Sequence, residues 1–222
     1  MPRSPASDRP SPALVFALSV GLLVGGGGFT QSATSTAPPT VRFSFRPVTA
    51  NGTVPAGYTP DNGAPYDPAR GHGWVTETSA RSAVPTPADA SPNTRNRRSE
   101  AGVPASLEER RYTLIHLQCA DICRLPHITQ SVAWVYRVEP GRYTVTVGVG
   151  DANPNTLFSG PSLHTVNVEG VRLINRFSAT AGNLFREVTT ALPVTVSDGL
   201  LTVDGIGGTN TKINYIVVTR VN

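Results

Sequence analysis

Aromatic side chains gather in a turn-rich stretch early in the chain, and their type suits recognition of flat ligands. Residues 51–74 are dense in Gly and Pro and carry Tyr58, Tyr66 and Trp74, with His72 beside them. Aromatic faces stack on the C–H side of a pyranose ring, and planar polar groups bind its hydroxyls. Tyr66 has no strand periodicity around it, which favours an exposed ring that contacts ligand. Trp74 fits a sugar platform or a plug at the edge of the core.

Two further segments carry polar side chains that could orient a sugar. Arg95 and Asn96 lie in an arginine-rich run, and guanidinium groups match the planar carboxylate of an acidic sugar. Asp151 and Asn153 follow a run ending in VGVGD, so we place them on an end loop. All four are candidate ligand-binding residues. The structural alternatives are a solvated charge for Arg95 and a turn cap for Asp151 and Asn153.

His116 is the last candidate binding residue. It alternates with Ile115 and Leu117, so it points away from them. If those two face the core, His116 and Gln118 line an outer sheet surface. A shallow sugar site on that surface and a purely structural histidine both fit this pattern.

The sequence contains no motif for the common hydrolases. It has neither a G-x-S-x-G elbow before a helix nor an H-E-x-x-H pair. Its acidic residues lie mostly in turns, which argues against a carboxylate pair for glycoside cleavage, although such a pair is spatial and not sequential. We therefore expect a non-catalytic protein, and a small hydrolase with a spatially assembled site is the alternative.

A glycine pair near the C-terminus invites comparison with a phosphate-binding loop. The segment GGTNTKINY begins at Gly207. A phosphate loop opens a helix, whose N-terminal amides hold the anion. Here the β-branched run Ile213–Val217 follows, and such residues favour a strand. We predict that Gly207 and Gly208 form a hairpin turn.

The N-terminus has the pattern of a secretory signal peptide. Arg3 and Arg9 precede an apolar run from Ala13 to Val24, and small residues follow it. The run is short for a membrane span, and an uncleaved anchor is the alternative. We assign residues 1–33 to the signal peptide and 34–39 to a linker, and expect a secreted or extracytoplasmic protein that meets the membrane only during export.

Composition bears on the partners and on the cysteines. The net charge is +4, nearly all of it from arginines that are scattered along the chain, so the clustered footprint of a nucleic-acid binder is missing. Cys119 and Cys123 are the two cysteines, and export favours a disulfide between them. Two ligands alone do not make a zinc site.

Short alternating runs predict an all-β domain. Val41–Phe45 reads as a first strand, and from Tyr112 about eight more follow, separated by Pro-Gly, Glu-Gly and Asp-Gly turns. We expect mostly sequential antiparallel hairpins in two sheets packed face to face as a jelly-roll β-sandwich. Trp134, in phase with Val132 and Val138, belongs to its core. Residues 76–110 are rich in Ala, Ser, Pro and Arg and predict a long, partly disordered loop.

Several segments together resemble bacterial malectin-like, galactose-binding-like domains. They include RYTLIHLQ, AWVYRVEPGRYTVTVGVGD and GLLTVDGIGGTNTKINYIVV, in that order, and the resemblance covers residues 40–222. It implies a carbohydrate-binding jelly roll. Residues 76–104 and 119–129 are longer than the family pattern.

The resemblance implies an exported, non-catalytic module that binds a polysaccharide or glycan. The alternative is a structural or protein-interaction domain that contacts other cell-envelope proteins. Calcium is a common structural ion in this fold family, and a structural calcium stays open, because the available oxygen ligands match no loop signature. Those ligands are Asp61, Asn62, Asp67 and Asp204.

Overall fold

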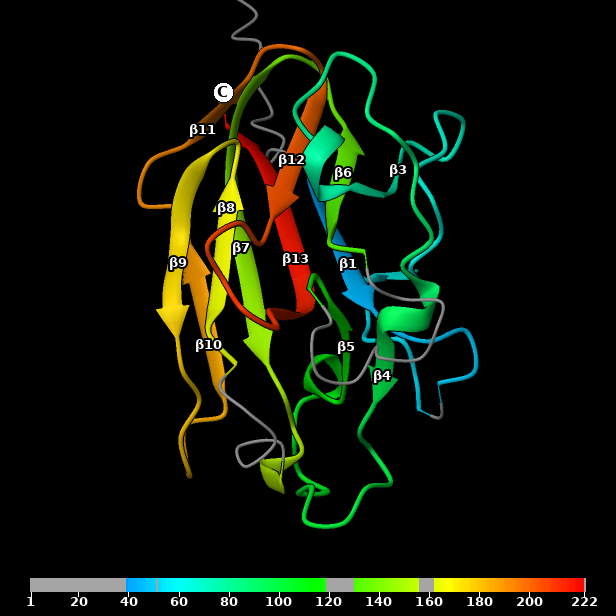
Figure 1. Cartoon of the computed structure of the whole chain (residues 1–222), viewed down its shortest axis with the longest axis vertical. Coiled ribbons are helices and arrows are strands. Elements are labelled where there is room, and N and C mark those ends of the chain that lie inside the picture. Colours follow the sequence, from blue (N-terminus) through cyan, green and yellow to red (C-terminus); the bar gives the residue numbers. More distant parts are fainter. Residues whose placement is uncertain (1–38, 51, 119–129, 156–161, 222) are drawn as a thin grey trace, which may run out of the picture. The chain divides into compact units, whose positions relative to one another are not determined.

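The computed structural model describes residues 39–50, 52–118, 130–155 and 162–221. In these ranges the chain forms two β-sheets packed as a sandwich, with three short 3-10 turns and no α-helix (Figure 1). The predicted all-β sandwich is confirmed. No helix among these residues is long and apolar enough to cross a membrane. The expected signal peptide and the two cysteines lie outside the described residues.

The larger sheet has eight strands and contains both ten-residue strands of the domain. Its central order is β10, β7, β13, β1, β2, while β11 pairs with β7, β5 pairs with β13 and β4 pairs with β5. The bounds are β1 Thr40–Phe45, β2 Thr59–Asp61, β4 Thr94–Asn96, β5 Thr113–His116, β7 Gly141–Gly150, β10 Phe185–Thr189, β11 Val194–Val196 and β13 Lys212–Val221.

The smaller sheet has five strands in the order β3, β6, β12, β8, β9, and every neighbouring pair is antiparallel. The bounds are β3 His72–Thr76, β6 Val132–Arg137, β8 His164–Val168, β9 Val171–Phe177 and β12 Leu200–Asp204.

The core follows the alternation of the strands. Tyr143, Val145, Val147 and Val149 of β7 are all buried in it, facing residues of the smaller sheet. Trp134 of β6 is fully buried, as its phase predicts. A second, smaller cluster buries the other face of β6 beneath the loop after β3. Both faces of β6 are therefore covered, which fixes its position firmly.

The connections differ from the predicted chain of hairpins. The β8–β9 hairpin at Glu169-Gly170 is confirmed. The predicted turns at Pro140-Gly141, at Ser197–Gly199 and at Gly207-Gly208 instead link a strand of one sheet to a strand of the other. Alternation marks which face of a strand is buried but not which sheet the strand joins, so the hairpin prediction at these three turns was wrong.

The composition of segment 76–110 predicts a long, partly disordered loop. The structure describes every residue of this segment. It contains β4 and the 3-10 turns η1 Glu77–Ser79, η2 Ser91–Asn93 and η3 Glu109–Arg111. Its main chain is tied to the sheets, since the Thr76 amide donates to the Thr86 carbonyl and the Arg97 amide donates to the Tyr112 carbonyl. Such pairing supplies the order that the low hydrophobicity of this stretch does not predict.

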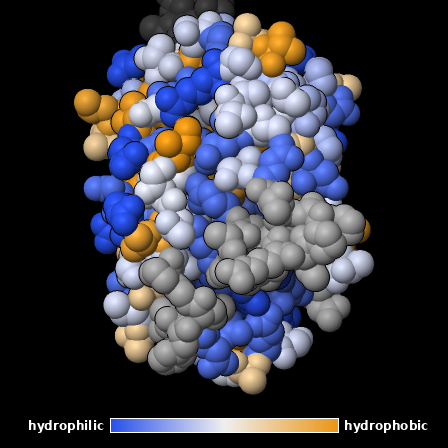
Figure 2. Space-filling model, in the orientation of Figure 1, coloured by the Kyte–Doolittle hydropathy of each residue, from blue (hydrophilic) through white to orange (hydrophobic). Residues whose placement is uncertain are grey.

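Apolar side chains are dispersed on the surface. On the face shown in Figure 2, apolar residues form small separate groups among hydrophilic ones. The large exposed hydrophobic side chains of the described residues include Val48, Val84, Val171 and Leu192, and of these Val171 and Leu192 line one hollow together. The described surface thus carries its apolar atoms mostly in small groups, which is normal for a folded domain.

One buried carboxylate links the two sheets. Asp61, at the end of β2, accepts hydrogen bonds at 2.9 Å from the indole nitrogens of Trp74 and Trp134. It also accepts the Gly63 amide at 2.9 Å. Because the two tryptophans belong to β3 and β6, the single carboxylate ties an edge of the larger sheet to the smaller one.

Replacing this carboxylate should be costly. Asp61→Ala leaves two indole N–H groups and one amide without an acceptor in a buried site, and we expect the free energy of unfolding to fall by about 3 kcal/mol or more. Chemical denaturation followed by tryptophan fluorescence measures it. Asp89→Ala is the matched control, because the exposed Asp89 accepts a hydrogen bond from the Ser91 amide and from no other described residue, and it should lose less than about 1 kcal/mol. Equal losses in the two variants would contradict this role for Asp61.

Candidate functional site

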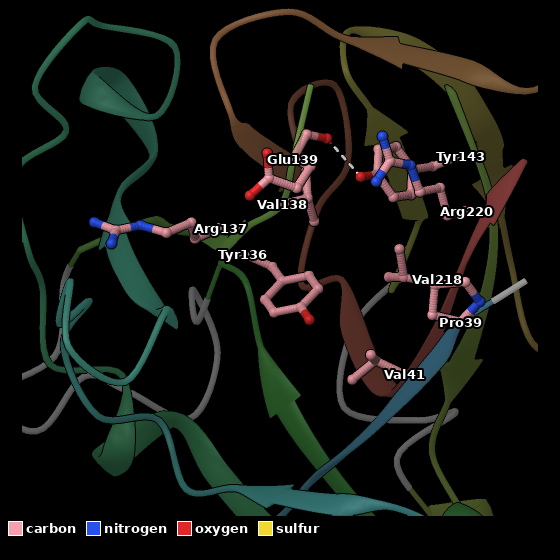
Figure 3. A pocket seen from close by; sticks show the side chains of 9 residues that line it. All are labelled: Pro39, Val41, Tyr136, Arg137, Val138, Glu139, Tyr143, Val218 and Arg220. Atoms are coloured by element: carbon pink, nitrogen blue, oxygen red, sulfur yellow. Dashed lines mark hydrogen bonds between the residues drawn. The ribbon is translucent and has the colours of Figure 1, made fainter. Parts of the chain in front are cut away.

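A pocket of about 330 Å³ opens at one end of the sandwich, between the two sheets (Figure 3). We name it the end pocket. Its volume lies at the lower end of the range of small-molecule sites. It is lined by Pro39, Val41, Tyr136, Arg137, Val138, Glu139, Tyr143, Val218 and Arg220. The larger sheet contributes β1, β7 and β13, and the smaller sheet contributes β6 and the turn after it.

Tyr136 forms the aromatic part of the end pocket and is held rigidly from behind. Its ring stacks on Trp134 at a centroid distance of 5.8 Å, and Phe43 meets it edge-on at 5.3 Å. Burial, and to a lesser degree the neighbouring Tyr143, raises the pKa of Tyr136, so the phenol stays protonated at physiological pH. Its hydroxyl has no hydrogen-bond partner among the described residues.

Charged groups lie around the same opening. The Tyr143 hydroxyl donates to the Glu139 carbonyl oxygen at 2.5 Å, which fixes the main chain of the turn that carries Glu139. Arg220 donates weakly to the Pro140 carbonyl at 3.4 Å. The Glu139 carboxylate and the Arg137 guanidinium make no hydrogen bond or ion pair with other described residues. The end pocket thus offers a carboxylate, guanidinium groups and a phenol to a ligand, between apolar walls.

A second hollow, of about 520 Å³, lies beside the end pocket, and we name it the Tyr66 hollow. It is lined by Tyr66, Pro68, Ser82, Ala83, Val84, Pro85, Pro87, Arg137, Asp198, Gly199 and Leu200. Tyr66 is half-buried and packs against the small cluster on the outer face of β6. The sequence predicts an exposed Tyr66 ring that contacts ligand, and the ring is partly covered by this packing. Arg137 borders both hollows.

Trp74 and His116, both predicted to bind ligand, lie where a ligand cannot reach them. Both are fully buried. Trp74 donates its indole N–H to Asp61 and packs edge-on against Phe45, so it is the core plug and offers no ring face to a sugar. His116 alternates with the core residues Ile115 and Leu117, but its ring is fully buried and is hydrogen-bonded to Asn210, just before β13, at 2.6 Å. This is a long-range contact that alternation along β5 does not predict.

Asp151 belongs to a buried ion network. Arg97 binds both of its carboxylate oxygens at 2.9 Å, and the ammonium group of Lys212 lies 3.2 Å from Oδ2. Burial alone would raise the pKa of Asp151, but the charges of Lys212 and Arg97 outweigh it and the pKa falls below its ordinary value. The carboxylate is saturated with protein donors, so a structural role replaces the expected sugar contact.

The remaining predicted residues surround this network. Asn153 donates its amide to Asp151 and its side-chain nitrogen to Glu100, each at hydrogen-bond distance. The Arg95 guanidinium donates to the Pro92 and Thr94 carbonyls, and Asn96 accepts the Arg98 amide. The structure therefore brings Asp151 and Asn153 together, with Arg95 and His116 nearby, and separates them from Tyr66.

The end pocket contains residues that sequence reasoning did not select. Tyr136 is in phase with Trp134 and reads as core, although its position at the strand end leaves its hydroxyl at the surface. Glu139 and Arg220 lie far apart in the sequence and meet because β13 pairs with β7, with Arg220 opposite Tyr143. A signal was present in Val138-Glu139-Pro140, a charged turn directly after an aromatic strand.

Among the described residues, no group of three or more His, Cys, Asp or Glu side chains is arranged to hold a metal ion. Three of the four residues proposed for calcium have other partners. Asp61 accepts the two indoles, and Asp204 accepts Arg81 and Asn167. Asp67 accepts the Ala69 amide.

Comparison with known proteins gives a likeness of fold. No family model and no curated protein matches the sequence. Similar solved structures include protein YXIM from Bacillus subtilis, at TM-score 0.45 and 16% identity over 83% of this chain and 40% of that one. The plant receptor-like kinase FER matches at TM-score 0.43 and 15% identity over 82% and 42% of the two chains. A family 35 carbohydrate-binding module from Clostridium thermocellum matches at TM-score 0.30 and 11% identity, over 58% and 89%.

Glycoside hydrolases are also among the similar structures. This chain spans about two fifths of the length of protein YXIM and of FER.

Two buried histidines predict a pH dependence of stability. Burial, followed by the charge of Lys212, lowers the pKa of His116 and of His164 to about 3 in each case. An unfolded histidine titrates near 6.5, so the unfolded chain binds more protons between pH 6.5 and 3. Each histidine should thus remove about 1.4 kcal/mol of stability per pH unit as the pH falls through this window.

Denaturant unfolding at pH 7, 6, 5 and 4 measures this slope. His116→Gln and His164→Gln should each flatten it by about 1.4 kcal/mol per pH unit, because each removes one proton-binding site from the unfolded chain. Variants with the wild-type slope would show that these histidines are protonated in the folded protein.

Proposed function

We propose that this protein is a non-catalytic, extracytoplasmic carbohydrate-binding module that holds a sugar unit in the end pocket. The observation that carries the proposal is the convergence of Tyr136, Glu139 and Arg220 on one opening whose other lining residues are three valines, a proline, Arg137 and Tyr143. Their polar groups have few protein partners and are therefore available to a ligand.

The chemistry of the end pocket suits a pyranose. A carboxylate such as Glu139 accepts hydrogen bonds from neighbouring hydroxyls, and the guanidinium of Arg220 donates to hydroxyl or ring oxygens. The neutral phenol of Tyr136 does both. Val41, Val138 and Val218 meet the C–H faces of the ring, whose burial contributes the hydrophobic part of the affinity.

The acid–base equipment of the pocket favours binding over cleavage. Glycoside hydrolysis normally uses two carboxyl groups, about 5 to 9.5 Å apart, on either side of the scissile bond. Among the residues that line the end pocket, Glu139 is the one carboxylate. A sugar held there meets donors and acceptors but no acid–base pair.

A second candidate function, a protein-interaction domain of the cell surface, is supported by a different hollow. It measures about 570 Å³, lies beside β9, β10 and β11, and is lined mainly by apolar residues such as Val171, Leu173 and Leu192. Leu192 is 79% exposed. If this is the functional surface, Leu192→Asp abolishes partner binding and leaves glycan binding unchanged.

Glycan binding is tested on an array of plant and bacterial polysaccharides, followed by calorimetry with the best binder. Glu139→Gln and Arg220→Ala should each weaken binding about 10-fold or more, because each removes a hydrogen bond to a charged group. Tyr136→Phe, which deletes only the hydroxyl, should weaken it about 5-fold.

Arg186→Ala is the control, since Arg186 is exposed on β10 and borders neither the end pocket nor the Tyr66 hollow. Its affinity should equal that of the wild type, and thermal unfolding should confirm that all variants fold. An array without any binder, or a binder that ignores Glu139 and Arg220, would remove the end pocket as a glycan site.

A further inference from the structure

The end pocket and the Tyr66 hollow are separated by a single rim of main chain. Val138 donates its amide to the Gly199 carbonyl at 2.9 Å, which joins the turn after β6 to the turn before β12. Val138 and Glu139 face the end pocket, whereas Asp198 and Gly199 face the Tyr66 hollow. The two hollows therefore lie back to back across two hydrogen-bonded turns.

Arg137 is the side chain that the two hollows share. It is the last residue of β6, and its amide donates to the Gly71 carbonyl at 2.7 Å, so its main chain is fixed. Its side chain is exposed and extends away from the Tyr136 ring in Figure 3. No other described residue binds the guanidinium. It can thus donate to groups of a ligand on either side of the rim.

The Tyr66 hollow has the composition of a second sugar subsite. Tyr66 and Leu200 both line this hollow and pack against the small cluster on the outer face of β6, and the Tyr66 hydroxyl makes no hydrogen bond to a described residue. Asp198 uses one oxygen to accept the Leu200 amide and keeps the other for a ligand. Prolines, which bring rigid apolar surface without side-chain ordering cost, form much of the remaining wall.

We propose that the ligand is an extended oligosaccharide that spans both hollows, with one unit in the end pocket, another against Tyr66, and Arg137 bound to the saccharide between them. This inference rests on the proposed glycan binding and adds the length of the ligand. Two subsites joined through one ligand raise the affinity, because the second contact forms within the complex at high effective concentration.

Calorimetric titration with malto-, cello-, xylo- and galacto-oligosaccharides of one to six units tests the inference. For the series that binds, the association constant should rise at least 100-fold from the monosaccharide to the length that reaches both hollows, and then level off. Tyr66→Ala should remove most of this rise and leave the affinity for the monosaccharide unchanged, because Tyr66 does not line the end pocket. Arg137→Ala should also remove most of the rise.

Two further variants keep the test decisive. Ala83→Trp fills the Tyr66 hollow from an exposed position and leaves Tyr66 itself unsubstituted, and it should also remove the rise even if Tyr66→Ala fails to fold. Glu139→Gln should weaken binding at every length, because the end pocket is used by all ligands, and Arg186→Ala should behave as the wild type.

The possible outcomes separate the two proposals. An affinity that does not depend on length, or a rise that survives both Tyr66→Ala and Ala83→Trp, overturns the two-hollow ligand while leaving the end pocket in place. If Tyr66→Ala lowers the affinity for the monosaccharide as much as the affinity for the oligosaccharide, the two-hollow ligand is overturned as well. If the protein binds none of the oligosaccharide series and no polysaccharide on the array, the proposed function itself is overturned.

Discussion

The structure depends on one buried carboxylate between two tryptophans. Asp61 reaches from β2 to the indole nitrogens of Trp74 and Trp134, and so locks the smaller sheet onto the edge of the larger one. Trp134 in turn supports the ring of Tyr136 by stacking. A buried carboxylate is tolerable only where donors saturate it, and here the donors are the largest side chains of the core. The aromatic wall of the end pocket is thereby an extension of the core.

A second buried network stabilises the opposite end of the sandwich. Asp151 follows β7 and Lys212 begins β13, and with Arg97 they form an ion cluster at hydrogen-bond distance. The end pocket borders the other ends of the same two strands, at Tyr143 and Arg220. Asp151 and Asn153, which the sequence suggests as sugar ligands, thus help to hold one end rigid, while polar groups with few protein partners collect at the other. Rigid elements place such groups more accurately than mobile loops do.

Much of the fold could be predicted from the alternation of apolar and polar residues along the strands. Little of the site could be predicted in this way. The pattern in Val145, Val147 and Val149 identifies the buried face of β7, and Trp134 is in phase with its neighbours. Alternation does not say which sheet a strand joins, so the turns at Pro140-Gly141 and Gly207-Gly208 were mistaken for hairpins. The site depends on such long-range pairing, because Arg220 meets Tyr136 and Glu139 only after the strands cross between sheets. Asp151 has the residue type of a sugar ligand, but its burial beside Lys212 could not be read from its neighbours in the chain.

The most direct test of the central claim is to map the binding surface on the folded protein. Amide ¹H–¹⁵N chemical shifts would be recorded while the glycan that binds on the array is titrated in. If the end pocket is the glycan site, the largest chemical-shift changes should occur at residues 136–143 and 218–220, and the amides around Asp151 and Lys212 should keep their shifts. Changes concentrated in β9, β10 and β11, with none at the end pocket, would contradict it.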